Sequence, residues 1–287
     1  MEKTESLKKN LENFSIGVVC HDSGGAEILS SFVKLNQANY NFTLSGPAVS
    51  IFRRKIKNCR NITLSNNLKI SDKFITGSGL GSNLEYSAIL KSKILGKKVY
   101  TFLDHWINYR KRFIRKKKKI FPDEIWVGDI YAKQKAIKFY KNIKLINNPF
   151  FLDTKEIYKK IKIIKNKNQI LFVSSNTDRI KSKKINDRKI FDRFLKYKFN
   201  YFPKHKILLR LHPTENKKKY NFYLKKNLNI TLDQNKELAK SLKSSFYVFG
   251  HNSMVLPIAN LCGIKTFNIL CGKKSTIPKN FISKILK

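Results

Sequence analysis

Two stretches of the C-terminal half indicate the fold most clearly: KILLRLHPTE at residues 206–215 and SSFYVFGHNSMVLPIANLCGIKTF at residues 244–267. Each contains an apolar, strand-like run that ends in a polar cluster, His212–Glu215 in the first and Gly250–Ser253 in the second. In an open parallel sheet, ligands bind just beyond the carboxyl ends of the strands. We therefore expect both clusters to lie along one edge of a sheet, where they would bind a phosphate-containing ligand.

The same succession of strand, polar turn and helix occurs along the rest of the chain. Short apolar runs alternate with segments of helical spacing, which is typical of a parallel sheet covered on both faces. The runs that resemble buried strands most closely are SIGVVC (15–20), KFIT (73–76), KVYTFL (98–103) and QILFV (169–173). The glycines after the first run do not fit the GxGxxG spacing, so the dinucleotide-binding fingerprint is absent.

These patterns predict an α/β protein with two Rossmann-like domains whose parallel sheets face each other across a cleft. The turn sequence Asn147-Asn148-Pro149 separates the two halves. We accordingly expect one domain at residues 1–148 and a second at residues 149–287. Residues 278–287 are expected to form a short basic helix.

The composition is strongly basic, with 60 Lys and Arg against 19 Asp and Glu and a formal net charge of +41. One interpretation is a nucleic-acid or anionic-membrane partner. The other is codon composition, because Lys, Asn and Ile are abundant and Lys is spread over the whole chain. The four Cys show no CxxC spacing, which favours a reducing cytoplasm. No signal peptide or run of about 20 apolar residues is evident, so we expect a cytoplasmic protein, with peripheral contact at the anionic inner membrane face as an open alternative.

Candidate donor-binding residues follow the strands of the C-terminal half. Ser174 and Ser175 come directly after QILFV, where hydroxyl and backbone N–H groups can hold a phosphate. Arg210 and His212 are two residues apart in a strand and so share a face. His212 can donate to a phosphate oxygen and stabilise a departing nucleotide. The alternative for His212 is a structural hydrogen bond within a loop.

The third donor-side cluster follows the second stretch quoted above. It contributes His251, Asn252 and Ser253 at the expected start of a helix. Asn and Ser are good helix N-cap residues, and capping is their alternative role. Capping and phosphate binding are compatible, because both use unpaired N–H groups of the first helical turn.

The N-terminal half supplies candidates for a catalytic base. A transferase needs a base near the acceptor hydroxyl, and Asp22, directly after the first strand, is the leading candidate. His21 and Glu27 are alternatives, and a turn-forming role is the other interpretation of Asp22. Gly24 and Gly25 would let an acceptor approach the backbone closely.

Further acceptor-side candidates lie at the ends of later strands. Ser78 belongs to the GSGLGS loop at residues 77–82, which can line a cleft or accept an anion. Asp104, His105 and Trp106 follow KVYTFL, with Arg112 at helical spacing behind them. An Asp–His pair can perform acid–base work, Trp106 can stack on a sugar or pack in the core, and Arg112 can bind a carboxylate or phosphate.

The run RKKKK at residues 115–119 has the densest charge of the chain. Such a run can steer an anionic polymer or lie on acidic lipid head groups. Its other interpretation is a solvated loop.

One resemblance is specific. An R-x-H-P strand end, a later GHNS helix start and the ending CGIKTF resemble the donor half of GT-B glycosyltransferases, over residues 169–267. The motifs are most similar to those of bacterial polysialyltransferases and of CDP-glycerol glycerophosphotransferases. The resemblance implies that His212, Ser253, Ser174 and Ser175 bind the donor phosphate. UDP-N-acetylglucosamine 2-epimerases share this architecture, so the match indicates the fold better than the reaction.

The sequence therefore predicts a transferase that moves a sugar or polyol-phosphate unit from a nucleotide-activated donor to a surface-glycan or lipid-linked acceptor. No cofactor is expected, and no metal, because a DxD pair is not evident. The first alternative is a nucleotide-sugar epimerase or hydrolase, in which Asp104, His105 and Glu215 would act as acid–base groups. The second is a non-enzymatic polyanion-binding protein, although aromatic residues interleaved with Lys and Arg in a recognisable nucleic-acid motif are not found.

Overall fold

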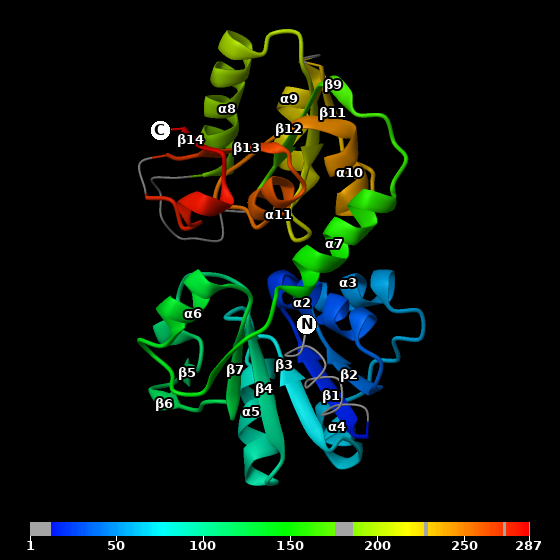
Figure 1. The fold of residues 1–287 in the computed structure, drawn as a ribbon, viewed down its shortest axis with the longest axis vertical. Coiled ribbons are helices and arrows are strands. Elements are labelled where there is room, and N and C mark those ends of the chain that lie inside the picture. Colours follow the sequence, from blue (N-terminus) through cyan, green and yellow to red (C-terminus); the bar gives the residue numbers. More distant parts are fainter. Residues whose placement is uncertain (1–12, 176–185, 227–228, 272–273, 287) are drawn as a thin grey trace. The chain divides into compact units, whose positions relative to one another are not determined.

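The computed structural model describes residues 13–175, 186–226, 229–271 and 274–286. The chain forms two compact units, Met1–Asp153 and Thr154–Lys287. Each contains one six-stranded sheet, and every strand pair within these two sheets is parallel (Figure 1). The predicted α/β class with two Rossmann-like parallel sheets is confirmed. The two units divide within helix α7 (Pro149–Lys160), which begins at the predicted turn.

The first unit has the strand order β2-β1-β3-β4-β7-β8. These strands are β1 (Ser15–Cys20), β2 (Asn39–Leu44), β3 (Lys73–Thr76), β4 (Lys98–Leu103), β7 (Glu124–Val127) and β8 (Ile143–Leu145). Its helices are α2 (Ser23–Leu35), α3 (Pro47–Lys55), α4 (Leu64–Ile70), α5 (Leu84–Ile94) and α6 (Ile130–Ala136). Ile28 and Phe32 of α2 share one core cluster with Phe52 of α3 and with Val18 and Phe102 of the sheet.

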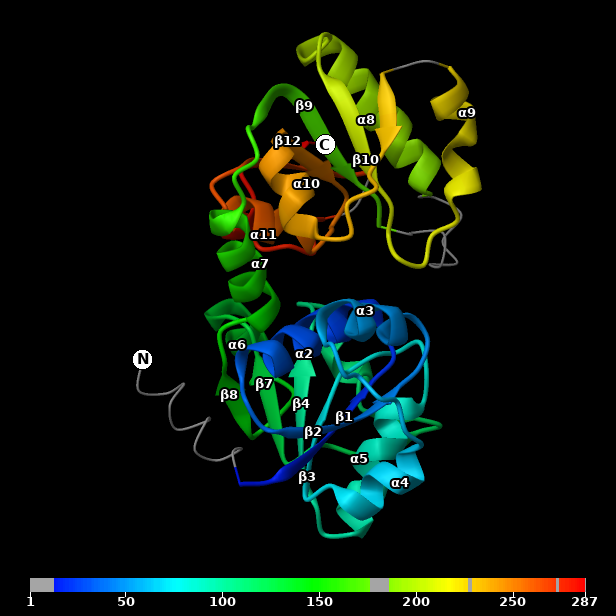
Figure 2. The same ribbon diagram turned by 90° about the vertical axis from the view of Figure 1, so that its right-hand side faces the viewer.

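The second unit has the strand order β11-β10-β9-β12-β13-β14. These strands are β9 (Asn166–Val173), β10 (Lys206–Arg210), β11 (Ile230–Leu232), β12 (Ser245–Gly250), β13 (Lys265–Ile269) and β14 (Lys284–Leu286). Its helices are α8 (Asp187–Tyr201), α9 (Asn221–Lys225), α10 (Leu238–Ser244) and α11 (Val255–Leu261), visible with the sheet in Figure 2. Its core is rich in aromatic rings, and Phe249 stacks on Phe267 with ring centroids 4.3 Å apart.

The strand register of the second unit brings its polar clusters to one edge. Val173, the last residue of β9, is paired with Arg210 of β10 on one side and with Gly250 of β12 on the other. Gly250 is in turn paired with Asn268 of β13. The segments that follow β9, β10 and β12 therefore leave the sheet at the same level, as the two sequence stretches predicted.

The C-terminal segment differs from its prediction. Residues 278–287 were expected to form a basic helix, but they contain a 3-10 turn, η4 (Lys279–Phe281), followed by strand β14. Phe267, Asn268 and Ile269 of β13 pair with β14, which extends the sheet at its edge. Backbone pairing to an open sheet edge outweighs the weak helical preference of so short a segment.

The basic run also differs from the expected loop. Strands β5 (Ile114–Arg115) and β6 (Lys118–Lys119) form an antiparallel hairpin, with Lys116 and Lys117 in the turn at φ of 45° and 64°. Arg112 does not lie on an α-helix with Trp106, since the segment between them contains only the 3-10 turn η1 (Tyr109–Lys111). In the described part of the chain, no helix has the length and apolar character needed to cross a membrane.

Candidate functional site

An imidazole–carboxylate pair lies where β1 leaves the sheet of the first unit. The Nδ1 atom of His21 is 2.6 Å from Oδ1 of Asp22. The other carboxylate oxygen, Oδ2, accepts hydrogen bonds from the backbone N–H groups of Leu80 and Gly81, at 3.0 and 3.3 Å. Both oxygens of Asp22 are thus engaged, and Nε2 is the imidazole nitrogen of His21 that does not face this carboxylate.

The Gly-rich loop at residues 77–82 supports this pair. The N–H groups of Leu80 and Gly81 donate to Asp22, whereas that of Gly77 donates to the carbonyl oxygen of Val19. A Cβ atom at Gly79 would lie 2.6 Å from Oδ2 of Asp22 and 3.0 Å from Oε1 of Glu85. A larger residue at 79 would therefore displace the carboxylates of Asp22 and Glu85.

Glu85 is a buried carboxylic acid that the sequence analysis did not include among the site residues. Its Oε1 accepts a hydrogen bond from the backbone N–H of His21 at 2.8 Å, and its Oε2 accepts one from the hydroxyl of Ser82 at 3.3 Å. Burial raises the pKa of Glu85, and the nearby charge of Asp22 adds to the rise. Its position in the first turn of α5, directly after a glycine-rich strand end, is the signal that identifies it.

A third carboxylate, that of Asp104, follows β4 at the same edge. Burial tends to raise the pKa of Asp104, but the guanidinium of Arg112, which pairs with Oδ1, holds it below its ordinary value. Arg112 also donates to the hydroxyl of Ser78 at 2.6 Å. A Cβ atom at Gly24 would lie 2.3 Å from Oδ2 of Asp104, so glycine is required where α2 begins.

Arg115 of the β5–β6 hairpin holds the Gly-rich loop from outside. Its Nη2 donates to the carbonyl oxygens of Gly79 and Ser82, at 2.9 and 3.3 Å. Its Nε donates to the side-chain oxygen of Asn83 at 3.1 Å. The hairpin is thereby connected through Arg115 to the loop whose backbone supports Asp22.

The structure therefore brings most predicted acceptor-side residues to one edge of the first sheet. These are His21, Asp22, Gly24, Gly25, Ser78, Asp104 and Arg112. Trp106 is the exception: only 2% of the residue is exposed, and its indole N–H donates to Asp129 at 2.9 Å. Of the two interpretations of Trp106, packing in the core is the one that its burial supports. The ring of His105 packs edge-on against Trp106, with centroids 5.6 Å apart.

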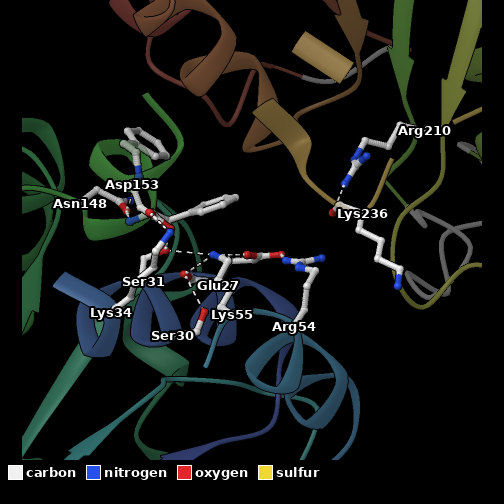
Figure 3. A network of polar contacts seen from close by, with 12 residues as sticks. Glu27, Ser30, Ser31, Lys34, Arg54, Lys55, Asn148, Asp153, Arg210 and Lys236 are labelled. Atoms are coloured by element: carbon white, nitrogen blue, oxygen red, sulfur yellow. Dashed lines mark hydrogen bonds and ion pairs between the residues drawn. The ribbon is translucent and has the colours of Figure 1, made fainter. Parts of the chain in front are cut away.

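Glu27, an alternative base in the sequence analysis, belongs to an ion-pair network. Figure 3 shows it beside Arg54 and Lys55 of α3, at 2.5 and 2.6 Å. Burial tends to raise the pKa of Glu27, but the two cations together hold it below its usual range. Asp153 of α7 extends the network through Ser31 and Lys34 at 3.1 and 2.7 Å. These contacts indicate that Glu27 has a structural role, in which its ion pairs join α2 to α3.

In the second unit, Ser174 connects the ends of β9 and β10. Its hydroxyl donates to Oε2 of Glu215, and its oxygen accepts the backbone N–H of His212 at 2.9 Å. Glu215 also pairs with Lys219 at 2.6 Å, and less than 2% of its side chain is exposed. Glu215, one of the acid–base groups considered for an epimerase, is therefore held by protein partners. The His212 imidazole has its Nδ1 atom 2.7 Å from the hydroxyl of Thr214.

A second polar group joins the ends of β12 and β13. His251 is buried, and its Nδ1 lies 2.6 Å from the carbonyl oxygen of Ile269. Asn252 adopts φ of 49°, a left-handed conformation that is uncommon outside glycine. Its N–H donates to Asn268 at 2.8 Å, and its side-chain oxygen accepts from Asn268 and from the Thr276 N–H, at 3.1 and 3.0 Å. Asn252 is thus fixed by three hydrogen bonds.

The remaining predicted donor residues have separate contacts. The hydroxyl of Ser175 donates to the carbonyl oxygen of His251, which joins the end of β9 to that of β12. The hydroxyl oxygen of Ser253 accepts the N–H of Val255 at 3.3 Å. Ser174, Ser175, His212, His251, Asn252 and Ser253 accordingly follow strands at one edge of the second sheet. Hydrogen bonds join Ser174 to His212, and Ser175 and Asn252 to His251.

Arg210 is the predicted donor residue whose contacts point elsewhere. Its guanidinium is 2.5 Å from the buried carboxylate of Asp233 and 3.2 Å from the hydroxyl of Ser241. It also donates to backbone oxygens of Asn235 and Lys236, the latter drawn in Figure 3. Arg210 therefore joins β10 to the loop after β11, and we remove it from the donor-binding set.

Metal binding was not expected from the sequence. Over the described ranges of the chain, no cluster of three or more His, Cys, Asp or Glu has the arrangement needed to hold a metal ion. Basic and dipolar groups are the candidates for charge stabilisation at both sheet edges.

Comparison with known proteins gives similarity of fold. No family model matches the chain, and no curated protein matches its sequence. A UDP-GlcNAc 2-epimerase from Neisseria meningitidis, bound to UDP-GlcNAc, superposes with a TM-score of 0.65 at 11% identity, over 92% of this chain and 84% of that one. The Staphylococcus aureus MnaA–UDP structure gives 0.63 at 13% identity, over 89% and 79%. The wall teichoic acid polymerase TagF gives 0.51 at 10% identity, over 91% and 71%. The fold is that of the GT-B class, which these epimerases and transferases share.

Proposed function

We propose that this protein is a metal-independent GT-B-type glycosyltransferase or polyol-phosphate transferase. It would use a nucleotide-activated donor, and its acceptor would be a surface glycan or a lipid-linked glycan. The observation that carries the proposal is the pairing of His21 with Asp22 at the carboxyl edge of the first sheet. An imidazole whose Nδ1 is held by a carboxylate is suited to accept a proton at Nε2.

This geometry revises the predicted base. Asp22 was the leading candidate, but both of its oxygens are occupied by His21, Leu80 and Gly81. Asp22 would fix the tautomer of His21 and stabilise the imidazolium that forms, and His21 would remove the proton from the acceptor hydroxyl. In the transfer step, the acceptor oxygen forms a bond to the activated carbon or phosphorus. The bond from that atom to the nucleotide leaving group breaks, and the acceptor proton moves to His21.

The donor would bind at the polar edge of the second sheet. His212 is half-buried and follows β10 beside Ser174, and Ser253 follows β12. A histidine and hydroxyl groups are suited to the oxygens of a leaving phosphate, which gains negative charge in the transition state. The resemblance of the R-x-H-P and GHNS motifs to cytidine-nucleotide transferases supports a cytidine-linked donor.

Two measurements test this function. Thermal unfolding should be recorded with CMP, CDP, UDP and GDP, because a ligand that binds only the folded state raises its stability. A stabilising nucleotide then identifies the donor class, and turnover of the matching activated donor should require an added glycan acceptor. Stabilisation by none of the four nucleotides would contradict the proposal.

A nucleotide-sugar epimerase or hydrolase is the second candidate. It is favoured by the buried acid Glu85, whose pKa is raised and which lies beside His21 and Asp22. A protonated carboxylic acid near a base could exchange protons on one sugar without an acceptor. Product analysis with the donor alone separates the two candidates, since the epimerase or hydrolase would convert it and the transferase would not.

A further inference from the structure

The first unit carries a surface on which exposed apolar side chains are surrounded by lysines. Residues 110–141 contain twelve Lys or Arg and three Asp or Glu, a ratio only slightly above that of the chain as a whole. The apolar members are exposed by 43–59%: Phe121, Ile130, Tyr131, Ile137 and Phe139. Exposed lysines of the hairpin and of the α6 region accompany them: Lys116, Lys117, Lys118, Lys119, Lys133, Lys138 and Lys141. We refer to these twelve residues as the α6–hairpin surface.

Aromatic contacts join the two parts of this surface. Phe113, at the base of the hairpin, packs edge-on against Tyr140 after α6, with centroids 5.4 Å apart. Phe121 and Phe139 both contact Tyr140, at 5.8 and 6.3 Å. The hairpin and α6 are drawn close to each other in Figure 1. Phe121 and Phe139 therefore belong to one aromatic cluster with Phe113 and Tyr140.

The carboxylates of this segment are already engaged within the unit. Asp129 accepts the N–H of Ala132 and that of the Trp106 indole, and so caps α6. Asp123 accepts the N–H of Val99, and Glu124 accepts the indole N–H of Trp126. The seven lysines of the α6–hairpin surface make no ion pair with any carboxylate of the described residues. Their positive charge is left for an external anionic partner.

Two isoleucines, one at the start of α6 and one at its C-cap, are exposed. Ala132 and Ala136, four residues apart, face the sheet and are buried. Ile130 and Ile137, at seven residues' spacing, lie on the opposite side and are 57% and 59% exposed. The solvent-facing side of a surface helix normally carries polar residues. Two isoleucines beside lysines on this side therefore indicate a partner that is apolar with an anionic border.

We propose that the α6–hairpin surface binds the anionic surface of a lipid bilayer. The lysines would contact acidic head groups, and Ile130, Ile137 and the exposed aromatic rings would enter the boundary with the acyl chains. A nucleic acid would use the lysines and the rings but has no use for exposed aliphatic side chains. This inference does not depend on the proposed reaction.

The test is flotation of the purified full-length chain with phosphatidylcholine vesicles, with and without phosphatidylglycerol. One variant replaces Lys116, Lys117, Lys118 and Lys119 by Gln. Its matched control replaces four exposed lysines of the second unit, Lys217, Lys218, Lys225 and Lys226, by Gln, and so has the same net charge. A second variant, Ile130→Gln with Ile137→Gln, is compared with Ile163→Gln and Ile164→Gln, two exposed isoleucines outside this surface.

We expect the wild type to float only with vesicles that contain phosphatidylglycerol. The hairpin variant should bind them at least about tenfold more weakly, since each basic residue near the membrane contributes substantially, and the Ile130/Ile137 variant should also bind more weakly. Both controls should bind like the wild type. If the variants and their controls lost vesicle binding to the same extent, the proposal would be overturned, because the attraction would come from the net charge of the whole chain. Unchanged binding of the Ile130/Ile137 variant, or binding of a single-stranded oligonucleotide but not of vesicles, would overturn it too. Matching thermal unfolding curves exclude misfolding as the cause.

Discussion

The Nδ1 atom of His21 lies 2.6 Å from Oδ1 of Asp22, and the other oxygen of Asp22 is held by two backbone N–H groups of the Gly-rich loop. Adjacent residues thus form an oriented pair in which both carboxylate oxygens of Asp22 are engaged by protein groups. The contacts of His21 and Asp22 therefore differ, although the two residues are neighbours in the sequence.

The first prediction concerns this pair. His21→Gln should lower turnover of the identified donor by about 10²–10⁴-fold, the usual contribution of a general base. Asp22→Asn should give a smaller loss, because the imidazole remains but its orientation and charge balance change. Steady-state rates with donor and acceptor measure both effects. A fully active His21→Gln enzyme with an inactive Asp22→Asn enzyme would reassign the base to Asp22.

The second prediction concerns His212. His212→Ala should abolish donor turnover and weaken nucleotide-induced stabilisation, because the imidazole would hold the leaving phosphate. His205→Ala is its control: His205 immediately precedes the same strand, β10, at the end opposite His212. Turnover and thermal shifts should be compared for both. If both variants behaved like the wild type, His212 would have no part in donor binding.

The third prediction uses the left-handed backbone of Asn252. Asn252→Ala and Asn252→Gly both remove the side-chain hydrogen bonds to Asn268 and Thr276. Alanine additionally keeps a side chain at φ of 49°, which is unfavourable by about 1–2 kcal/mol for a residue other than glycine. The glycine variant should therefore have the higher free energy of unfolding by about 1 kcal/mol, measured by urea titration. Equal stabilities would show that backbone strain is absent.

The fourth prediction concerns pH and Glu27. The pKa of Glu27 in the folded chain lies below its ordinary value of 4.5 because of Lys55 and Arg54, which outweigh the effect of burial. The ionised carboxylate therefore stabilises the fold above pH 4.5, and this contribution is lost as the pH falls through the folded-state pKa. At pH 7, Glu27→Gln should lower the free energy of unfolding by about 3 kcal/mol, because two cations lose their partner.

The control for that measurement is Glu156→Gln. Glu156 pairs with Lys159 at 2.8 Å but is exposed to solvent, so its replacement should leave the unfolding curve unchanged. Urea titrations at pH 7 and at successively lower pH should show the deficit of Glu27→Gln shrinking below pH 4.5, the ordinary value of its pKa. A deficit that is independent of pH would indicate lost packing instead of lost charge.

Local patterns were sufficient to predict the parallel sheets and the polar edge of the second one. The runs ILFV at 170–173 and ILL at 207–209 are apolar on both faces, as is typical of strands in the middle of a covered sheet. The parallel register then places Ser174, His212 and His251 at one level without further information.

Partners distant in sequence were not predictable in the same way. Arg210 ends β10, two residues before His212. The direction of its side chain, however, depends on its ion pair with Asp233, which lies 23 residues further along the chain. Trp106 was placed correctly after its strand, yet its burial depends on Asp129 and on the packing around it. Glu85 was not among the predicted site residues, because only the fold shows that it reaches the backbone of His21.

Arg115 connects the β5–β6 hairpin to the Gly-rich loop at residues 77–82. It belongs to the hairpin of the α6–hairpin surface, and it holds the carbonyl groups of the loop whose N–H groups support Asp22. A partner that displaced Arg115 from these carbonyl groups would remove two hydrogen bonds that hold the loop. Thermodynamic reciprocity then requires that a ligand which orders the loop alters the affinity of the hairpin for its partner by the same factor.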